Sequence, residues 1–340
     1  MFRISTYYEG VVVMAPRKPA KSSSPKVNTG KPGRAAGGRD TGSGKGGGKP
    51  PSTGRTSGSS SRSSGPREGG PRGRPIRQSD ARRSAPVAKG LGGEQIEGRQ
   101  AVRELLIGQR RKVKEIWIAQ DIDPAAIIDD IQQLADAARV TVLEVPRRTL
   151  EDTARSEAPQ GIIAFAQPLE EADFNALMTK RNGVMPFLVA VDGVTDPGNL
   201  GALLRCCDGA GVTGVILPKH RAVHVTPTVA KTSAGAIEHV PMTLVPGLPV
   251  AITQMRDKGI WVVGLDDSSE NTLFDIANFA TDGICIVLGS EGTGLSRLVR
   301  ERCDTVVSIP MLGQVSSLNV SAAAALATYE VTRARLASPA

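Results

Sequence analysis

The sequence predicts an α/β protein with two folded domains behind a long basic N-terminal segment. Residues 1–90 lack the apolar composition of a folded domain, unlike the rest of the 340-residue chain. From about Glu94 onward, short apolar runs alternate with segments of helical period, which is typical of an α/β fold. The runs after residue 186 are apolar throughout, which favours parallel strands covered on both faces.

Residues 1–90 are predicted to be a disordered basic tail. They contain 19 Lys and Arg against 4 Asp and Glu, and no aromatic residue lies between Met14 and Gly90. So little apolar surface cannot offset the entropy lost on ordering. The rest of the chain is net acidic, so the tail accounts for the formal charge of +8. We expect the tail to contact RNA or DNA phosphates, with a solubility extension as the alternative.

Residues 1–13 differ in composition from residues 14–90, and Met14 is a second candidate for the first translated residue. The first 13 residues lack the apolar core of a secretory signal, and no run reaches the roughly 18 apolar residues of a membrane helix. The four cysteines have no metal-ligand spacing and fit reduced thiols; they are Cys206, Cys207, Cys285 and Cys303. We therefore expect a cytoplasmic protein.

Residues 94–168 are predicted to form a small α/β domain, followed by a linker at 169–185 that holds one short helix in "EADFNALMTK". Residues 186–337 are predicted to form a larger one. In the small domain we expect helices at 99–107, 124–138 and 147–154, and strands at 113–119, 140–145 and 161–166. In the large domain we expect strands at 187–192, 212–217, 240–244, 260–265, 284–289 and 305–309, with helices between them and a last helix at 319–336.

The loop "DGVTDPGNLGALLR" (192–205) leads from the first strand of the large domain into a helix. Its Asp-Pro-Gly at 196–198 is turn chemistry, and Asn199 is a candidate helix cap. Arg205 is a lone cation in an otherwise apolar helix. Such a charge needs a carboxylate or phosphate partner.

Two further loops carry polar side chains at strand ends. "GSEGTG" (289–294) holds Glu291 between glycines, and this carboxylate is either solvated or paired with Arg205. "GQVSSLN" (313–319) places Ser316, Ser317 and Asn319 before the last helix, which is more polar groups than one cap requires. Because open α/β sheets bind ligands at the carboxyl ends of their strands, the three loops predict one pocket.

Other site types are disfavoured. No GxxxxGK[ST] occurs, and no GxGxxG follows the first strand, so nucleotide-binding folds of those classes are unsupported. The three histidines, His220, His224 and His239, do not have the spacing of a zinc site, and no metal is expected. Aromatic residues make up 3% of the chain, so base stacking is not the main source of any RNA affinity.

Taken together, the loops resemble the motifs of the SpoU/TrmH family, the RNA ribose 2′-O-methyltransferases of the SPOUT class. The three family motifs are similar to "DPGNLGALLR" (196–205), "VLGSEGTGLS" (287–296) and "IPMLGQVSSLNVSAAAA" (309–325). The segment at 231–241 resembles the family's middle segment, and the domain beginning "IEGRQAVRELL" resembles its small, ribosomal-protein-like substrate-binding domain. The likeness covers about 94–336.

The resemblance implies a parallel sheet whose C-terminal part threads into a trefoil knot, S-adenosylmethionine as cofactor, and a homodimer. It also implies the site residues by position. The catalytic set corresponds to Asn199, Arg205, Glu291, Ser317 and Asn319. The cofactor contacts correspond to Gly264, Leu265, Gly289, Ile309, Met311 and Leu318. A guanidinium stays protonated, so Arg205 is expected to stabilise the developing alkoxide, oriented by Glu291.

The resemblance favours methylation of a guanosine 2′-hydroxyl in 23S rRNA, because the family's tRNA enzymes usually carry helical extensions in place of the small domain. A tRNA 2′-O-methyltransferase and an rRNA methyltransferase that confers antibiotic resistance are alternatives within the class. From another class, a non-catalytic RNA-binding assembly factor would suit the basic tail. It would tolerate change at Arg205 and Glu291.

Overall fold

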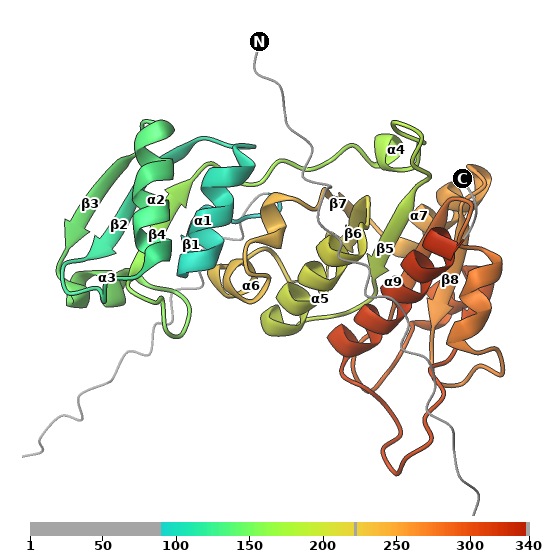
Figure 1. Cartoon of the computed structure of the whole chain (residues 1–340). Helices are drawn as coiled ribbons and strands as arrows, with labels where there is room; N and C mark the ends of the chain where they lie inside the picture. Colours follow the sequence, from blue (N-terminus) through green and yellow to red (C-terminus); the bar gives the residue numbers. More distant parts are fainter. Residues whose placement is uncertain (1–89, 221–222, 338–340) are drawn as a thin grey trace, which may run out of the picture. The chain divides into compact units, whose positions relative to one another are not determined.

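The computed structural model describes residues 90–220 and 223–337. The tail predicted at 1–90 lies outside these residues apart from Gly90. The described chain forms a four-stranded mixed sheet, followed by a six-stranded parallel sheet (Figure 1). The α/β class and the parallel sheet expected from the sequence are confirmed. Within the described residues, no helix combines the length and apolar character needed to cross a bilayer.

The mixed-sheet domain has the strand order β1-β4-β2-β3. Strands β2 and β3 are parallel and the other neighbours antiparallel. Ile116 and Ile118 of β2 belong to the core that α1 and α2 cover, whereas Trp117 belongs to a small cluster with Leu150 of α3. Helices therefore pack on both faces. The elements are β1 (Gln95–Glu97), α1 (Arg99–Gly108), β2 (Val113–Ala119), α2 (Ala126–Ala137), β3 (Thr141–Val145), α3 (Arg147–Thr153) and β4 (Ile162–Ala166).

The parallel-sheet domain has the strand order β10-β8-β9-β5-β6-β7, with every neighbouring pair parallel. Its strands are β5 (Phe187–Val191), β6 (Gly214–Pro218), β7 (Met242–Val245), β8 (Trp261–Leu265), β9 (Ile284–Leu288) and β10 (Thr305–Val307). Its helices, with α4 in the linker, are α4 (Phe174–Leu177), α5 (Pro197–Ala210), α6 (Pro227–Thr232), α7 (Leu248–Asp257), α8 (Arg297–Arg302) and α9 (Val320–Ala337), and the 3₁₀ turns are η1 (Ala236–Glu238) and η2 (Leu273–Asn278).

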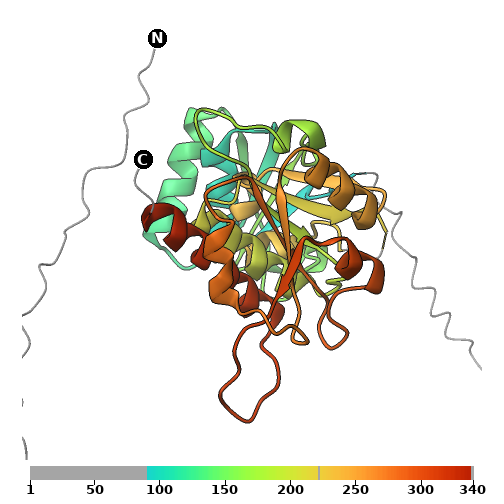
Figure 2. The same ribbon diagram turned by 90° about the vertical axis from the view of Figure 1, so that its right-hand side faces the viewer.

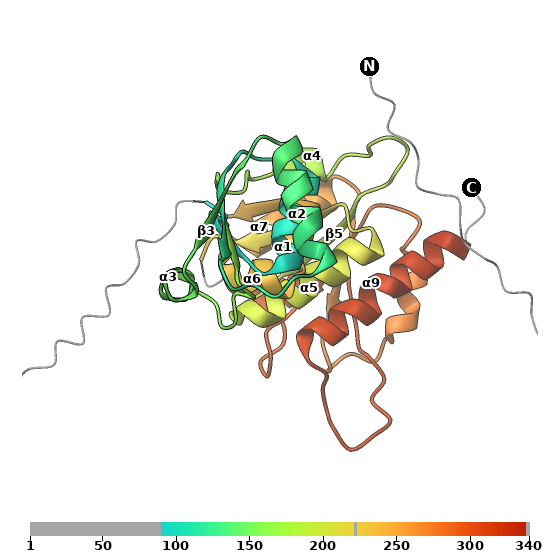
Figure 3. The same cartoon turned by 60° about the vertical axis from the view of Figure 1, so that its left-hand side comes forward.

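Alternating side chains of the buried strands supply two separate cores. On β5, Phe187 and Val189 face the core that contains α5 and α9, whereas Leu188 and Ala190 face the core that contains α7 and α8. Figure 3 shows α5 and α9 side by side, and Figure 2 shows the helices around the sheet. Burial on both faces explains why these strands read as unbroken apolar runs.

The structure adds elements that the sequence pattern does not reveal. Strand β1 is only three residues long and has no counterpart among the expected strands. Helix α6 lies between β6 and β7, where a helix is expected, and the 3₁₀ turn η1 follows it inside the segment at 231–241. The strand expected at 240–244 begins two residues later, at Met242. The trefoil knot stays a prediction of the resemblance.

A buried ion pair joins the two domains. Arg111, before β2, donates to Glu238 of η1 from Nε at 3.0 Å and from Nη2 at 2.5 Å, and both side chains are at most 3% exposed. The remaining Arg111 nitrogen, Nη1, donates to the carbonyls of Gly93 and Gln167. Every charged atom is therefore paired, as burial requires.

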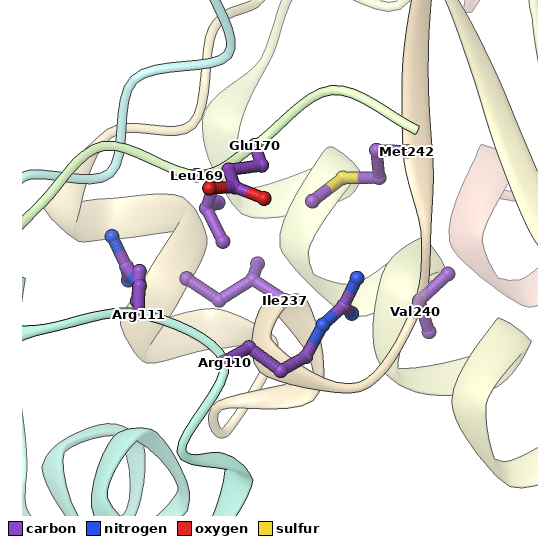
Figure 4. Close-up of a pocket in the computed structure, with 7 residues that line it drawn as sticks. All are labelled: Arg110, Arg111, Leu169, Glu170, Ile237, Val240 and Met242. Atoms are coloured by element: carbon purple, nitrogen blue, oxygen red, sulfur yellow. The ribbon is translucent and has the colours of Figure 1, made fainter. Parts of the chain in front are cut away.

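A cavity of about 30 Å³ lies beside this ion pair, large enough for about one water molecule. Figure 4 shows the side chains that line it, among them Arg110, Glu170 and Ile237. They come from the segment before β2, the segment after β4, and the segment from η1 to β7. Arg110 also donates to the backbone carbonyls of Glu238 and His239. The junction is thus tied by several polar contacts and has little free volume.

Replacing Glu238 by Ala should destabilise the protein by about 3–5 kcal/mol, because it leaves the Arg111 guanidinium buried without a counter-charge. The exposed pair between Arg148 and Asp152 provides the control, and Asp152→Ala should change stability by less than about 0.5 kcal/mol. Urea unfolding measures both. Equal effects of the two substitutions would contradict the role given to the buried pair.

Candidate active site at the carboxyl edge of the parallel sheet

The loop after β9 forms a tight hairpin that carries Glu291 at its tip. Ser290 and Gly294 exchange backbone hydrogen bonds of 3.1 and 3.0 Å across it. A Cβ on Gly289 would lie 2.3 Å from the carbonyl carbon of Gly294, so only glycine fits there. Gly292 has a φ of +81°, which completes the turn without strain. The hairpin therefore exposes the Glu291 carboxylate on a short, constrained loop.

Helix α5 begins immediately after the loop that follows β5. Its N-cap is Asp196, whose carboxylate accepts a 2.7 Å hydrogen bond from the backbone N–H of Asn199. The expectation that Asn199 caps this helix is therefore wrong. Pro197, with its fixed φ, takes the first helical position, so the cap falls on the residue before it. As a result, the side-chain amide of Asn199 is free for another contact.

That amide joins a cluster of three side chains. Asn199 Nδ2 donates to Glu291 Oε1 at 2.5 Å. Asn319 Nδ2 donates to the same carboxylate oxygen at 3.2 Å and to Asn199 Oδ1 at 2.9 Å. Asn319 also caps α9, because its Oδ1 accepts from the backbone N–H of Ser321 at 2.8 Å. The structure thus brings together three of the five predicted catalytic residues, one from each loop.

Arg205 does not pair with Glu291. It is exposed on α5 and makes no hydrogen bond or ion pair with the described residues. It lies six positions after Asn199, and at about 100° per residue the two side chains leave α5 in different directions. The pairing that the sequence left open is therefore absent, and Glu291 is held by two amides instead. Arg205 keeps its charge available for an anion.

The third loop, residues 308–319 between β10 and α9, extends away from the sheet (Figures 1 and 2). Ser316 and Ser317 are exposed on it and do not join the cluster. Leu312 is 98% exposed, Val315 66% and Leu318 38%. Apolar side chains in water on a single loop indicate a surface that packs against something else in the working protein.

The predicted cofactor residues follow three neighbouring strands. Gly264 and Leu265 end β8, Gly289 follows β9, and Ile309 follows β10, so all four lie at one edge of the sheet. The two others, Met311 and Leu318, lie on the extended loop. A Cβ on Gly264 would lie 2.7 Å from the side chain of Leu295. Packing against the β9 loop is thus a second reason for glycine at this position.

Two carboxylates that the sequence analysis did not select hold the far end of the β9 loop. Asp266, directly after β8, accepts from Leu295 N at 3.3 Å, and Asp192, directly after β5, accepts from Ser296 N at 2.7 Å. Strands β8 and β5 flank β9, so consecutive amides are held from both sides. The only sequence signal was an acidic residue directly after each strand, a position at which acids are common.

Asp266 has further partners. Its Oδ1 accepts hydrogen bonds from the backbone N–H and the hydroxyl of Ser268, and lies 3.3 Å from Arg300 Nη1. Burial acts to raise the pKa of Asp266, but the hydrogen bonds from Ser268 and Leu295 and the charge of Arg300 outweigh it. The pKa of Asp266 is therefore lowered, and the carboxylate stays charged under ordinary conditions.

The four cysteines are free thiols, and Cys206 lies near the cluster, with its Sγ 3.9 Å from the backbone carbonyl oxygen of Ser321. Burial raises the pKa of Cys207 and Cys285, which are fully buried, and raises that of Cys303 to about 12. Protonated thiols are poor nucleophiles, so these three are unsuited to covalent chemistry.

Comparison with known proteins identifies two family matches. Residues 186–329 match the SpoU rRNA Methylase family, and residues 95–172 match the family described as RNA 2′-O ribose methyltransferase substrate binding. A protein of Staphylococcus haemolyticus, assigned by name to the TrmH family of tRNA/rRNA methyltransferases, is 41% identical over 242 residues. The match covers 71% of this chain and 95% of that protein.

Solved structures agree with this likeness. The SpoU methyltransferase AviRb of Streptomyces viridochromogenes, in complex with the cofactor AdoMet, superposes with a TM-score of 0.60 at 25% identity, covering 72% of this chain and 91% of AviRb. A crystal structure of an RNA 2′-O ribose methyltransferase superposes with a TM-score of 0.59 at 28% identity, covering 71% of this chain and 88% of that one.

Replacing Asp266 by Asn should lower stability near pH 7, and the deficit should shrink in acid. A carboxyl group titrates near 3.9 in an unfolded chain, and the folded value is lower here. The carboxylate therefore contributes stability above about pH 4, and this contribution is lost as the pH falls through the folded pKa. Urea unfolding between pH 3 and pH 7 measures the difference. Asp267→Asn, at the exposed neighbour, is the control, and an equal pH-dependent deficit there would contradict the assignment.

Proposed function

Because the chain belongs to the SpoU (TrmH) family of RNA methyltransferases, we propose that it transfers a methyl group from S-adenosylmethionine to a ribose 2′-hydroxyl, and that the acceptor is a guanosine of 23S rRNA. The observation that carries the proposal is the cluster of Asn199, Glu291 and Asn319, which follow β5, β9 and β10 in the chain and meet in space. RNA is the substrate, and the domain that matches the substrate-binding family at 95–172 contacts it.

In this proposal the cofactor binds at the edge formed by the ends of β8, β9 and β10. Leu265 ends β8 and Ile309 follows the neighbouring strand β10, and both offer apolar surface at this edge. Gly289 lets the β9 loop fold back against Gly294. Met311 and Leu318 on the extended loop would cover the bound molecule. When bound, S-adenosylmethionine supplies an electrophilic methyl carbon.

The side chains have separate tasks in this proposal. Methyl transfer is an in-line displacement, so holding the ribose oxygen against the methyl carbon contributes most. Asn199 and Asn319 fix the Glu291 carboxylate through Oε1, which leaves Oε2 free to accept a hydrogen bond from the ribose. Arg205 stabilises the developing alkoxide and the adjacent phosphate, and Ser317 positions the cofactor once the loop closes. The transfer yields the 2′-O-methyl ribose, S-adenosylhomocysteine and the proton of the hydroxyl.

The choice of 23S rRNA rests on the small mixed-sheet domain, and a tRNA substrate or a resistance-conferring rRNA methylation is the alternative.

We also propose that the active unit is a homodimer. Three large apolar side chains of α9 support this, because Leu326 is 46% exposed, Tyr329 52% and Leu336 82%.

Incubation of unmodified 23S rRNA and of a tRNA pool with labelled S-adenosylmethionine tests the proposal. We expect label in 23S rRNA, mapped by mass spectrometry to the ribose of a single guanosine, and none in tRNA. Binding to 23S rRNA should weaken steeply with salt, and less steeply for a chain that starts at residue 91, because the removed tail is basic. Label confined to tRNA would contradict the substrate assignment. Calorimetry that finds no S-adenosylmethionine binding would instead favour an assembly factor.

Replacing Arg205 by Ala should lower kcat/KM for RNA methylation by about 100-fold or more, because it removes charge stabilisation at the reacting oxygen. The Kd for S-adenosylmethionine should stay within twofold of wild type, since Arg205 is not among the predicted cofactor contacts. Calorimetry and initial rates measure the two quantities, and Lys258→Ala, an exposed position on the far end of α7, is the control. Parallel loss of activity and cofactor affinity would contradict this division of tasks.

A further inference from the structure

A second cavity opens at the same edge of the parallel sheet. Its volume is about 440 Å³, within the range of pockets that hold small ligands. The walls come from the ends of β5 and β6, the start of α7, the β9 loop and the start of α8. None of the six predicted cofactor residues lines it. The cavity shares no residue with the predicted S-adenosylmethionine contacts, but two of its lining residues, Gly294 and Leu295, pack against Gly289 and Gly264 of that site.

The cavity and the catalytic cluster share the β9 hairpin as a wall. Ser290 and Thr293, whose hydroxyls lie 2.5 Å apart, face the cavity on either side of Glu291 in the sequence. Glu291 itself contacts residues of α5 and α9, which cover one face of the sheet, whereas the cavity borders α7 and α8 on the other face. If a nucleotide placed its ribose at Glu291, only the β9 hairpin would lie between that ribose and this cavity.

The lining suits a nucleobase. Pro218, Leu248 and Pro249 provide apolar surface against which a flat ring can lie. Around them stand groups that can bond to base edges or to a phosphate, namely the hydroxyls of the β9 hairpin, His220 and Arg297. The Arg297 side chain is 83% exposed. Its one ion-pair partner among the described residues, Glu301, is 3.7 Å away, which is a long contact, so Arg297 is available to a ligand.

The lining carboxylate, Asp192, uses one of its two oxygens within the protein. Its Oδ2 accepts a hydrogen bond from the backbone N–H of Ser296 at 2.7 Å. The cavity therefore presents an arginine, a histidine, hydroxyls and the second oxygen of Asp192, Oδ1, to its contents. Donors and acceptors of this kind suit the edge of a base, and Arg297 can bind an adjacent phosphate.

We propose that this cavity holds the base of the nucleotide whose ribose is methylated. The inference rests on the proposed function, and it names where base identity is read. Sequence-specific recognition of RNA generally takes bases out of their stack and places them in such pockets. Methyl transfer to a 2′-hydroxyl involves no atom of the base, so a separate pocket is needed if the enzyme is to select one nucleotide among many.

Two cavity variants and one control test the proposal. Ser296→Trp fills the cavity from an exposed position whose side chain makes no cap hydrogen bond, and Arg297→Glu reverses the available charge. Lys258→Glu makes the same charge reversal at the far end of α7 and is the control. For each protein, filter binding gives the Kd for 23S rRNA transcript, initial rates give KM for RNA, and calorimetry gives the Kd for S-adenosylmethionine.

We expect both cavity variants to raise the KM and the Kd for RNA at least tenfold, with the Kd for S-adenosylmethionine within twofold of wild type and the control unchanged. A parallel loss of cofactor affinity would overturn the proposal, because the cavity would then belong to the cofactor. RNA binding equal to that of the control would also overturn it. Filter binding needs no turnover. If the wild-type protein transferred no methyl group, the proposed function would be wrong, but the binding data would still show whether the cavity contacts RNA.

A synthetic RNA that lacks the base at the methylated nucleotide makes the assignment specific. For wild type this change should lower kcat/KM at least tenfold. For Ser296→Trp it should lower kcat/KM less than twofold further, because the contact is already lost and the two effects are not additive. Additive losses would overturn the proposal. Non-additivity that appears only with a neighbouring nucleotide's base removed would overturn the assignment to the methylated nucleotide.

Discussion

The convergence of three distant chain segments on the Glu291 carboxylate is the interaction on which the rest of the site depends. Asn199 lies 92 residues before Glu291, and Asn319 lies 28 residues after it. Both amides donate to the same oxygen, so the carboxylate is oriented by neutral donors. The parallel sheet makes this possible, because all its strands present their carboxyl ends at one edge. The constrained hairpin after β9 then fixes how far Glu291 extends from that edge.

Supports outside the cluster keep the hairpin in place. Asp192 and Asp266, from the strands on either side of β9, hold consecutive amides where the loop returns to α8. At the other end, Gly289 lies so close to Gly294 that no side chain fits. The hairpin thus separates two neighbouring spaces, the predicted cofactor and ribose site on one side and the proposed base pocket on the other. A substrate RNA would contact both spaces, and Arg205 remains free to bind the negative charge of the RNA.

The sequence predicts most of the parallel sheet because each strand is a continuous apolar run, and burial on both faces requires this pattern. It also selects Asn199, Glu291 and Asn319, through the family motifs. It misplaces the cap of α5, since Asp196 and Asn199 are both good caps and only the position of Pro197 in the helix decides between them. It misses Asp192 and Asp266 because the contacts by which they hold the β9 loop are to the backbone amides of Leu295 and Ser296, which leave no mark in a sequence. It cannot show that Arg205 and Glu291 are apart, because that depends on how α5 turns above the sheet.

Hydrogen–deuterium exchange of the full chain, with and without S-adenosylmethionine, tests the central claim most directly. If the ends of β8, β9 and β10 form one cofactor site, the donor should slow exchange together in peptides that cover 264–266, 289–294 and 309–319. Peptides from the proposed base pocket, at 218–220 and 248–249, should exchange as before. Protection confined to the base-pocket peptides, or to only one of the three loops, would contradict the claim that these segments act as a single site.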